Sequence, residues 1–324
     1  MNKIKRIMVL VVLLSSIITG CRAEEETVTV VLPTNTPIPI PKMMPGEPPP
    51  QAERTLEDVD SSIKAGEKRA VTGDNFLNSL YERPFTAQEM VYQPHLNILT
   101  ASIVSDEYFY YFTIVLDEVD PTTGTLTGTY GIEFDRTLTG RGDLLVWASI
   151  FTEEWSMDGL EVYSDPYAQV GGVKPIVAEE GYENDGYVNT VELKDDQVAW
   201  VRLAPDQETA LQIAISRGLL GDPEEFLWGA WADGGISNPA LFDYNDHFGP
   251  SEAGSPINTD PDYPLKAVAS LDNTCRLPYG FAQVGSTPGM CLSIPELNQK
   301  LVCRCVRWSP PTAQPVVCLE WECE

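Results

Sequence analysis

Residues 106–151 read DEYFYYFTIVLDEVDPTTGTLTGTYGIEFDRTLTGRGDLLVWASIF and predict three consecutive antiparallel strands. In the first, aromatic and aliphatic residues recur at every second position from Tyr108 to Leu116, so they share one face of a strand. A Pro-Thr-Thr-Gly turn leads to a second alternating strand at 130–135, and a glycine-containing loop leads to a third at 144–151, which is apolar on both faces. This pattern is typical of a sheet with a buried face.

Further short apolar runs flank these three strands, and turns rich in Gly, Pro and Asp separate them. No long amphipathic helix interrupts the series. The chain is therefore predicted to be all-β, a two-layer antiparallel β-sandwich of about nine strands with a small disulfide-rich C-terminal appendix. The remaining predicted strands are 96–103, 160–162, 187–193, 198–203, 211–215 and 226–231.

The composition of the chain limits the kinds of partner that it can bind. The 324 residues leave room for one large domain with appendages or for two small ones. The formal net charge is -27, from 48 acidic and 21 basic residues. Such a surface repels phosphate backbones, so the sequence argues against nucleic-acid binding. It attracts cations, calcium especially, although an acidic surface also serves simply to keep a protein soluble.

The N-terminus resembles the signal peptide of a bacterial lipoprotein, residues 1–21. Basic residues precede an unbroken apolar run at 7–14, and Ile-Thr-Gly-Cys at 18–21 matches a lipobox. The resemblance implies acylation of Cys21, a membrane partner reached through that lipid, and a location in the cell envelope on its extracytoplasmic side. An ordinary signal peptide and an uncleaved anchor helix are the alternatives, but the apolar run is short for an anchor.

The next segments differ sharply in composition. Residues 22–54 are rich in Pro, Thr and Glu and predict a disordered, extended tether. The β-sandwich domain is predicted at 55–270 and the Cys-rich C-terminal segment at 271–324.

The six cysteines besides Cys21 all lie in that last segment, and an even number in an exported chain predicts three disulfides. We expect Cys275 and Cys291 to form a local pair and the other four to join among themselves. Zinc binding is the alternative that the close spacing leaves open. The six are Cys275, Cys291, Cys303, Cys305, Cys318 and Cys323.

Two acidic segments are candidate metal sites in which calcium, if bound, would be structural. One is the loop from Asp135 to Asp143, a degraded calcium-loop pattern whose simpler interpretation is a polar hairpin loop. In the other, carboxylates, an amide and an imidazole are close in sequence, which suits a metal or polar-ligand site. The alternative is that these side chains cap turns by hydrogen bonds to their own backbone. The members of this second segment are Asp233, Asp243, Asn245, Asp246 and His247.

Aromatic residues offer a third kind of site. Phe109, Tyr111 and Trp231 have the outward parity on their strands and are candidates for stacking against sugar rings. The competing interpretation is that they belong to the core.

The order LNILTASIVSDEYFYYFTIVLDE, TYGIEFD, LQIAISRGLLG and FLWGAWADGG within 94–235 resembles the DOMON and family 9 carbohydrate-binding sandwiches. Asn97-Ile98-Leu-Thr-Ala101 stands where those families have Asp-Ile-x-x-Ala. The resemblance implies an extracellular sandwich that binds sugar or haem.

Motifs for a serine hydrolase, a zinc protease and a phosphate loop are missing from the sequence. We therefore expect a lipid-anchored binding module for an extracellular polysaccharide, with no cofactor required, rather than an enzyme. A secreted hydrolase with a carboxylate pair and a structural or assembly protein of the envelope are the alternatives.

Overall fold

The computed structural model describes residues 43–69, 73–171, 186–255, 263–282 and 290–291, together with the backbone of 303–308 and 318–323. All of them belong to the unit Pro41–Glu324. The predicted signal peptide, Cys21 and the tether before Met43 lie outside the described residues.

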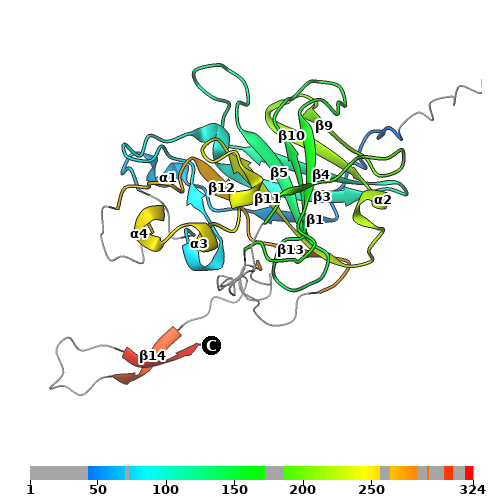
Figure 1. Cartoon of the computed structure of the whole chain (residues 1–324). Helices are drawn as coiled ribbons and strands as arrows, with labels where there is room; N and C mark the ends of the chain where they lie inside the picture. Colours follow the sequence, from blue (N-terminus) through cyan, green and yellow to red (C-terminus); the bar gives the residue numbers. More distant parts are fainter. Residues whose placement is uncertain are drawn as a thin grey trace, which may run out of the picture. The chain divides into compact units, whose positions relative to one another are not determined.

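Strands β1 to β13 form two antiparallel sheets (Figure 1). The first has the order β1 (Arg54–Glu57), β3 (Ile98–Ser105), β4 (Phe109–Leu116), β10 (Gln207–Ser216) and β9 (Ala199–Ala204). The second has the order β2 (Glu82–Arg83), β12 (Leu271–Asn273), β11 (Phe226–Asp233), β5 (Thr129–Asp135), β6 (Leu144–Ala148), β7 (Leu160–Ser164) and β8 (Asn189–Thr190), and β13 (Leu277–Tyr279) also pairs with β11. The predicted all-β architecture is confirmed.

Residues 106–151 contain β4, β5 and β6, as the sequence predicts, but β4 belongs to one sheet and β5 and β6 to the other. The chain crosses between the sheets through the segment after β4. There, the Asp120 carboxylate accepts hydrogen bonds from Thr122 N at 2.8 Å and Thr127 Oγ1 at 2.9 Å. Gly124 takes a φ of 72°, which a residue without Cβ adopts at no steric cost.

The main core lies between the two sheets, where side chains at every second position meet from both sides. Phe112 on β4 contacts Phe134 on β5 and Trp228 on β11, with ring centroids 5.5 and 5.1 Å apart. Burying a large apolar side chain of this kind contributes about 1.5–3 kcal/mol. The alternation in the sequence thus identifies the inward face correctly.

Both outward faces are covered as well. On the larger sheet, Trp147 and Trp231 pack against Phe242 and Tyr244, which come from the region of the short helices. On the smaller sheet, a separate buried cluster includes residues from β4 and β10 together with Trp155. A side chain that points outward from its sheet is therefore not necessarily exposed to solvent in this protein.

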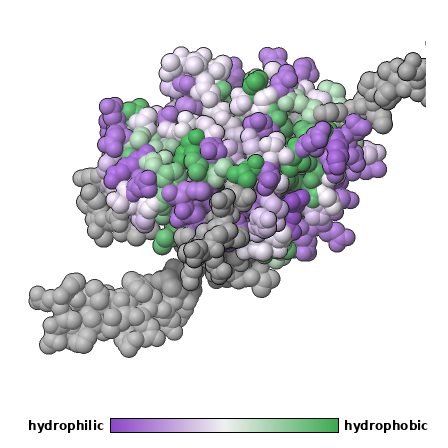
Figure 2. Space-filling view, in the orientation of Figure 1, coloured by the Kyte–Doolittle hydropathy of each residue, from purple (hydrophilic) through white to green (hydrophobic). Residues whose placement is uncertain are grey.

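The helices of the described residues are all short. The α-helices are α1 (Ser62–Ala65), α2 (Arg217–Leu220), α3 (Tyr244–His247) and α4 (Pro250–Ala253). The 3₁₀ helices are η1 (Phe76–Asn78), η2 (Pro94–Leu96) and η3 (Pro239–Leu241). On the face in view, hydrophilic residues are interspersed with smaller hydrophobic areas (Figure 2).

Part of the predicted tether is packed against the sandwich. The indole nitrogens of Trp200 and Trp155 donate to the carbonyls of Met43 at 3.0 Å and Gly46 at 3.2 Å. Arg202 forms an ion pair with Glu47 at 2.7 Å. A proline-rich segment cannot build a core of its own, but it can dock on a surface that the rest of the chain provides. Similarly, β12 and β13 fall in the predicted C-terminal segment and yet complete the larger sheet.

The C-terminal segment contains the predicted local disulfide. Cys275 and Cys291 are bonded, with their Cα atoms 5.0 Å apart. Further on, β14 (Cys303–Trp308) pairs antiparallel with β15 (Cys318–Cys323), as a hairpin would. The side chains of the other four cysteines lie outside what the structure describes, so their pairing stays a prediction.

Candidate functional site

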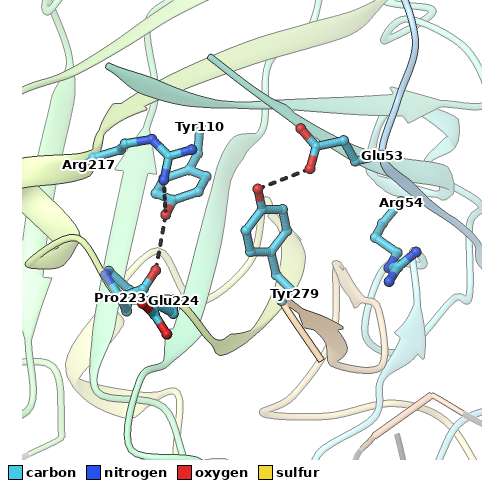
Figure 3. A pocket seen from close by; sticks show the side chains of 8 residues that line it. Glu53, Arg54, Tyr110, Arg217, Pro223, Glu224 and Tyr279 are labelled. Atoms are coloured by element: carbon cyan, nitrogen blue, oxygen red, sulfur yellow. Dashed lines mark hydrogen bonds between the residues drawn. The ribbon is translucent and has the colours of Figure 1, made fainter. Parts of the chain in front are cut away.

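A pocket of about 430 Å³ is lined by residues of both sheets and of the segments that lead into them (Figure 3). This volume falls within the range of about 300–1,000 Å³ that is typical of small-molecule sites. The lining residues are Glu53 and Arg54 at β1, Tyr110 on β4, Arg217 on α2, Pro223 and Glu224 before β11, Tyr279 on β13, and Gly280.

Arg217 is the most tightly held of the charged residues in the pocket. The Ser216 side chain caps α2, and Gly221 ends it at a φ of 82°, so the helix is a single fixed turn. The guanidinium donates to Asp106 O at 3.0 Å and to Tyr110 Oη at 2.7 Å. It also lies 4.4 Å from the centre of the Tyr110 ring, a cation–π contact. A preorganised guanidinium of this kind loses little entropy when it binds a ligand.

Tyr110 lies beneath that guanidinium and is fully buried. Burial raises the pKa of its hydroxyl to about 12, and the positive charge of Arg217 opposes the rise. The hydroxyl is therefore protonated at neutral pH, and it donates to the carbonyl of Pro223 at 3.2 Å. In this way the tyrosine links α2 to the turn that carries Glu224.

Tyr279 occupies the middle of the view in Figure 3, with Arg217 and Glu224 on one side and Arg54 on the other. Its ring stacks on Phe226 with centroids 4.8 Å apart. Its hydroxyl donates to Glu53 Oε2 at 3.0 Å. The ring is thus fixed by packing, and its polar end takes part in the wall of the pocket.

Arg54 and Glu224 differ from these residues, because within the described part of the chain neither forms an ion pair. Both are exposed, so their charged groups are accessible to a ligand. The charges of the two arginines and the two glutamates in the lining cancel, although the whole chain carries a formal net charge of -27. The pocket therefore suits a neutral ligand that both donates and accepts hydrogen bonds.

The residues predicted as a calcium loop use their oxygens within the loop. Asp135 accepts hydrogen bonds from the backbone nitrogens of Thr137, Thr139 and Gly140, the last at 2.6 Å. Asp143 forms an ion pair with Arg136 at 2.6 Å. Burial raises the pKa of Asp143, while the arginine counteracts that rise. This geometry is that of a hydrogen-bonded hairpin loop.

The second acidic segment is also largely engaged. Asp233 accepts from the backbone nitrogens that follow it, at Gly235, Ile236 and Ser237. Asp243 and His247, in contrast, come together as the sequence suggested: the carboxylate oxygen lies 2.6 Å from Nε2. Asn245 and Asp246 lie between them on α3.

The hydrogen bond that the His247 ring donates to the Asp243 carboxylate raises the pKa of His247, and partial burial of the ring opposes that rise. Nε2 also contacts the carbonyl of Ala240 at 3.1 Å. These contacts fix the ring at the end of α3.

The predicted stacking residues are buried. Phe109 and Tyr111 are 2% and 1% exposed beneath Trp155 and the segment at Met43. Trp231, 2% exposed, stacks on Phe242 at 4.7 Å. None of the three presents a free ring face in this structure.

The pocket residues were not anticipated, because Tyr110 has the inward parity and Glu53 lies in the predicted tether. The sequence offers one signal for this site. Arg217 and Gly218 directly follow a long strand, which places a polar group at that end of the sandwich. Elsewhere, carboxylate oxygens of Asp58, Glu82 and Asp272 gather within 4.8 Å of one another.

No family of known proteins, no curated protein and no solved structure was found to match the chain. Among the described residues, no helix is both long and apolar enough to cross a bilayer.

Proposed function

We propose that this protein is a lipid-anchored, extracytoplasmic binding module that takes up a neutral saccharide in the pocket between Arg54, Arg217, Glu224 and Tyr279. The observation that carries the proposal is the lining itself: charged donors and acceptors in equal number around fixed tyrosine rings. Sugars present many hydroxyls, each both donor and acceptor, and apolar C–H faces that pack against aromatic rings.

The charge distribution supports a neutral sugar over an anionic one. The protein surface is strongly acidic, so long-range attraction for a polyanion is absent. Within the pocket, Glu53 and Glu224 would oppose a carboxylate or phosphate, while the two guanidiniums can bind hydroxyls. The resemblance to the family 9 carbohydrate-binding sandwiches is consistent with this ligand class.

Attachment to the envelope rests on the sequence of residues 1–21, with Cys21 as the acylated residue. A lipid-held module would keep its pocket outside the membrane, where polysaccharides occur. The pocket is also compatible with hydrolysis, because two glutamates line it and glycoside hydrolysis uses a carboxyl pair.

The test is retention of the full chain on immobilised neutral polysaccharides, with a uronic-acid polymer as the anionic comparison. Arg54→Ala and Glu224→Ala should each weaken binding about tenfold or more, because a hydrogen bond to a charged group contributes ~1.5–3 kcal/mol. Glu225→Ala is the matched control, since Glu225 is exposed and adjacent but not part of the lining.

Retention on none of the neutral polymers would refute saccharide binding. Equal weakening by Glu225→Ala would show that the pocket is not the site. Release of reducing ends during incubation would instead assign a hydrolase that acts through the two glutamates.

A further inference from the structure

Three carboxyl groups meet at the edge of the sandwich where β2, β12 and the end of β1 come together. Glu82 on β2 is directly opposite Asp272 on β12, and Asp58 is the residue after β1. One oxygen from each lies within 4.8 Å of the other two. The three residues come from strands or strand ends far apart in the sequence, so the fold creates the cluster.

The cluster lies on the interior side of the larger sheet. Asp272 is opposite Ala232 on β11, and Ala232 is part of the main core, so Asp272 and Glu82 share that inward face. They are 0% and 3% exposed. Asp58 reaches them from the smaller sheet, where its backbone nitrogen donates to Leu99 O at 2.9 Å.

The hydrogen bonding of the cluster is incomplete. Asp272 Oδ2 accepts from Ile98 N at 2.7 Å. The other Asp272 oxygen, Oδ1, and also Glu82 Oε2 and Asp58 Oδ2, are buried and have no hydrogen-bond partner among the described residues. Buried carboxylate oxygens normally have a donor or a cation, so a group of three carboxyls that each keep an unpartnered buried oxygen indicates a missing positive charge.

The protein does not supply that charge from the described residues. Asp58, Glu82 and Asp272 are not within ion-pair distance of any lysine or arginine there. The nearest residue in sequence, Arg83, has its side chain engaged elsewhere, in a buried ion pair with Asp74 at 2.6 Å. Burial raises the pKa of all three carboxyl groups, that of Asp58 to about 8, and the charges of neighbouring carboxylates add to the rise for Glu82 and Asp272.

We propose that Asp58, Glu82 and Asp272 bind one divalent cation, with Ca²⁺ preferred, and that the ion joins the two sheets at this edge. The ligands are all oxygen, which Ca²⁺ and Mg²⁺ favour. Ca²⁺–oxygen distances of about 2.3–2.6 Å allow two ligands on opposite sides of an ion to be about 5 Å apart. The observed separations fall inside that limit. Backbone carbonyls and water would complete the six to eight ligands that Ca²⁺ takes.

The test is calorimetric titration of the EDTA-treated full chain with CaCl₂ at pH 7.5. High salt, about 0.5 M, screens diffuse binding to the acidic surface. We expect one saturable site and a rise in Tm of about 5–10 °C at a hundred times the Kd. MgCl₂ should bind at least tenfold more weakly.

Variants locate the ion. Glu82→Gln and Asp272→Asn should weaken Ca²⁺ binding at least tenfold and remove the rise in Tm, whereas Glu57→Gln, an exposed neighbour of Asp58, should bind as the unmodified chain does. Asp58→Asn, at the less buried side of the cluster, provides a second test if an interior variant does not fold. Saturable binding that survives these changes would overturn the proposal, as would the absence of saturable Ca²⁺ binding to the unmodified chain at millimolar Ca²⁺. Neither result depends on saccharide binding.

Discussion

The guanidinium of Arg276 lies 2.8 Å from the carboxylate of Glu133, and both groups are buried on the outward side of β5. The hydroxyl of Tyr187 donates to the same carboxylate at 3.0 Å. Arg276 follows Cys275, so an ion pair and a disulfide hold the same short segment against the larger sheet. The outward face thus has its own charged interior, enclosed by loops and short helices rather than open to solvent.

This pair predicts a large loss of stability when it is broken. Arg276→Ala leaves Glu133 buried without its counter-charge, which should cost about 3–5 kcal/mol of unfolding free energy. Urea unfolding followed by tryptophan fluorescence is the measurement. Arg69→Ala removes an equivalent charge from an exposed site and should change stability by less than about 0.5 kcal/mol. A loss below about 1 kcal/mol for Arg276→Ala would show that the pair is not buried as described.

The contact between Asp243 and His247 predicts a pH dependence of stability. Because the pKa of His247 is raised in the folded state, its contribution is fully present below the unfolded value of about 6.5 and is lost as pH rises through the folded value. His247→Gln should therefore destabilise the protein more at pH 5.5 than at pH 8.5. Unfolding free energies of both proteins at the two pH values are the measurement.

His95 provides the control of opposite sign. Burial lowers its pKa, so protonation penalises the folded state as pH falls. His95→Gln should then become less harmful, relative to the unmodified chain, at pH 5.5 than at pH 8.5. If both variants showed the same trend, the pH dependence would arise elsewhere, for example in the carboxyl cluster.

The architecture follows from the sequence because period-two alternation reports directly on burial between two sheets. All nine predicted strands correspond to strands of the structure, from β3 to β11. Within the two sheets of the sandwich, the strands that were not predicted, β1, β2, β12 and β13, have at most four residues. Runs this short carry too little alternation to stand out, and they form because a neighbouring strand offers unpaired backbone groups.

The site could not be predicted in the same way. The alternation of side chains along each strand correctly placed Phe109, Tyr111 and Trp231 on outward faces. Segments distant in sequence, around Met43 and Phe242, cover them. The pocket and the carboxyl cluster each join residues more than 150 positions apart, such as Glu53 with Tyr279. Such neighbours depend on strand order and crossovers, which a single sequence does not encode locally.

The disulfide between Cys275 and Cys291 predicts a further stability effect. Closing a loop of about 15 residues contributes ~3 kcal/mol in the chain-entropy model, through restriction of the unfolded state. Replacing both cysteines by Ser should lower the unfolding free energy by roughly that amount without altering the sandwich. The measurement is urea unfolding of the double variant beside the unmodified chain under non-reducing conditions. An unchanged midpoint would contradict the stabilisation that the chain-entropy model assigns to this disulfide.

The N-terminal prediction concerns attachment rather than stability. If Cys21 is acylated, Cys21→Ser should move the protein from the membrane fraction to the soluble fraction or block its processing. Fractionation and the mass of the mature chain measure this. Ser16→Ala, inside the same leader but outside the lipobox, is the control and should leave both unchanged. If Cys21→Ser also left both unchanged, the lipoprotein interpretation would be wrong.

The last prediction separates the two roles of Tyr279 in the pocket. Tyr279→Phe keeps the ring that stacks on Phe226 but removes the hydroxyl that donates to Glu53. Stability should fall by only ~0.5–1.5 kcal/mol, the usual net value of one hydrogen bond. Saccharide affinity should fall further, because the pocket loses the lining hydroxyl beside Glu53 that a sugar can hydrogen-bond, while Ser105 still holds the Glu53 carboxylate at 2.9 Å. Tyr108→Phe is the matched control, since Tyr108 is 54% exposed and does not line the pocket. Retention on the polysaccharide and the unfolding midpoint, measured on the same preparations, give the two quantities. A Tyr279→Phe protein that binds normally would place the ligand away from Glu53, on the side of the pocket formed by Arg217 and Glu224.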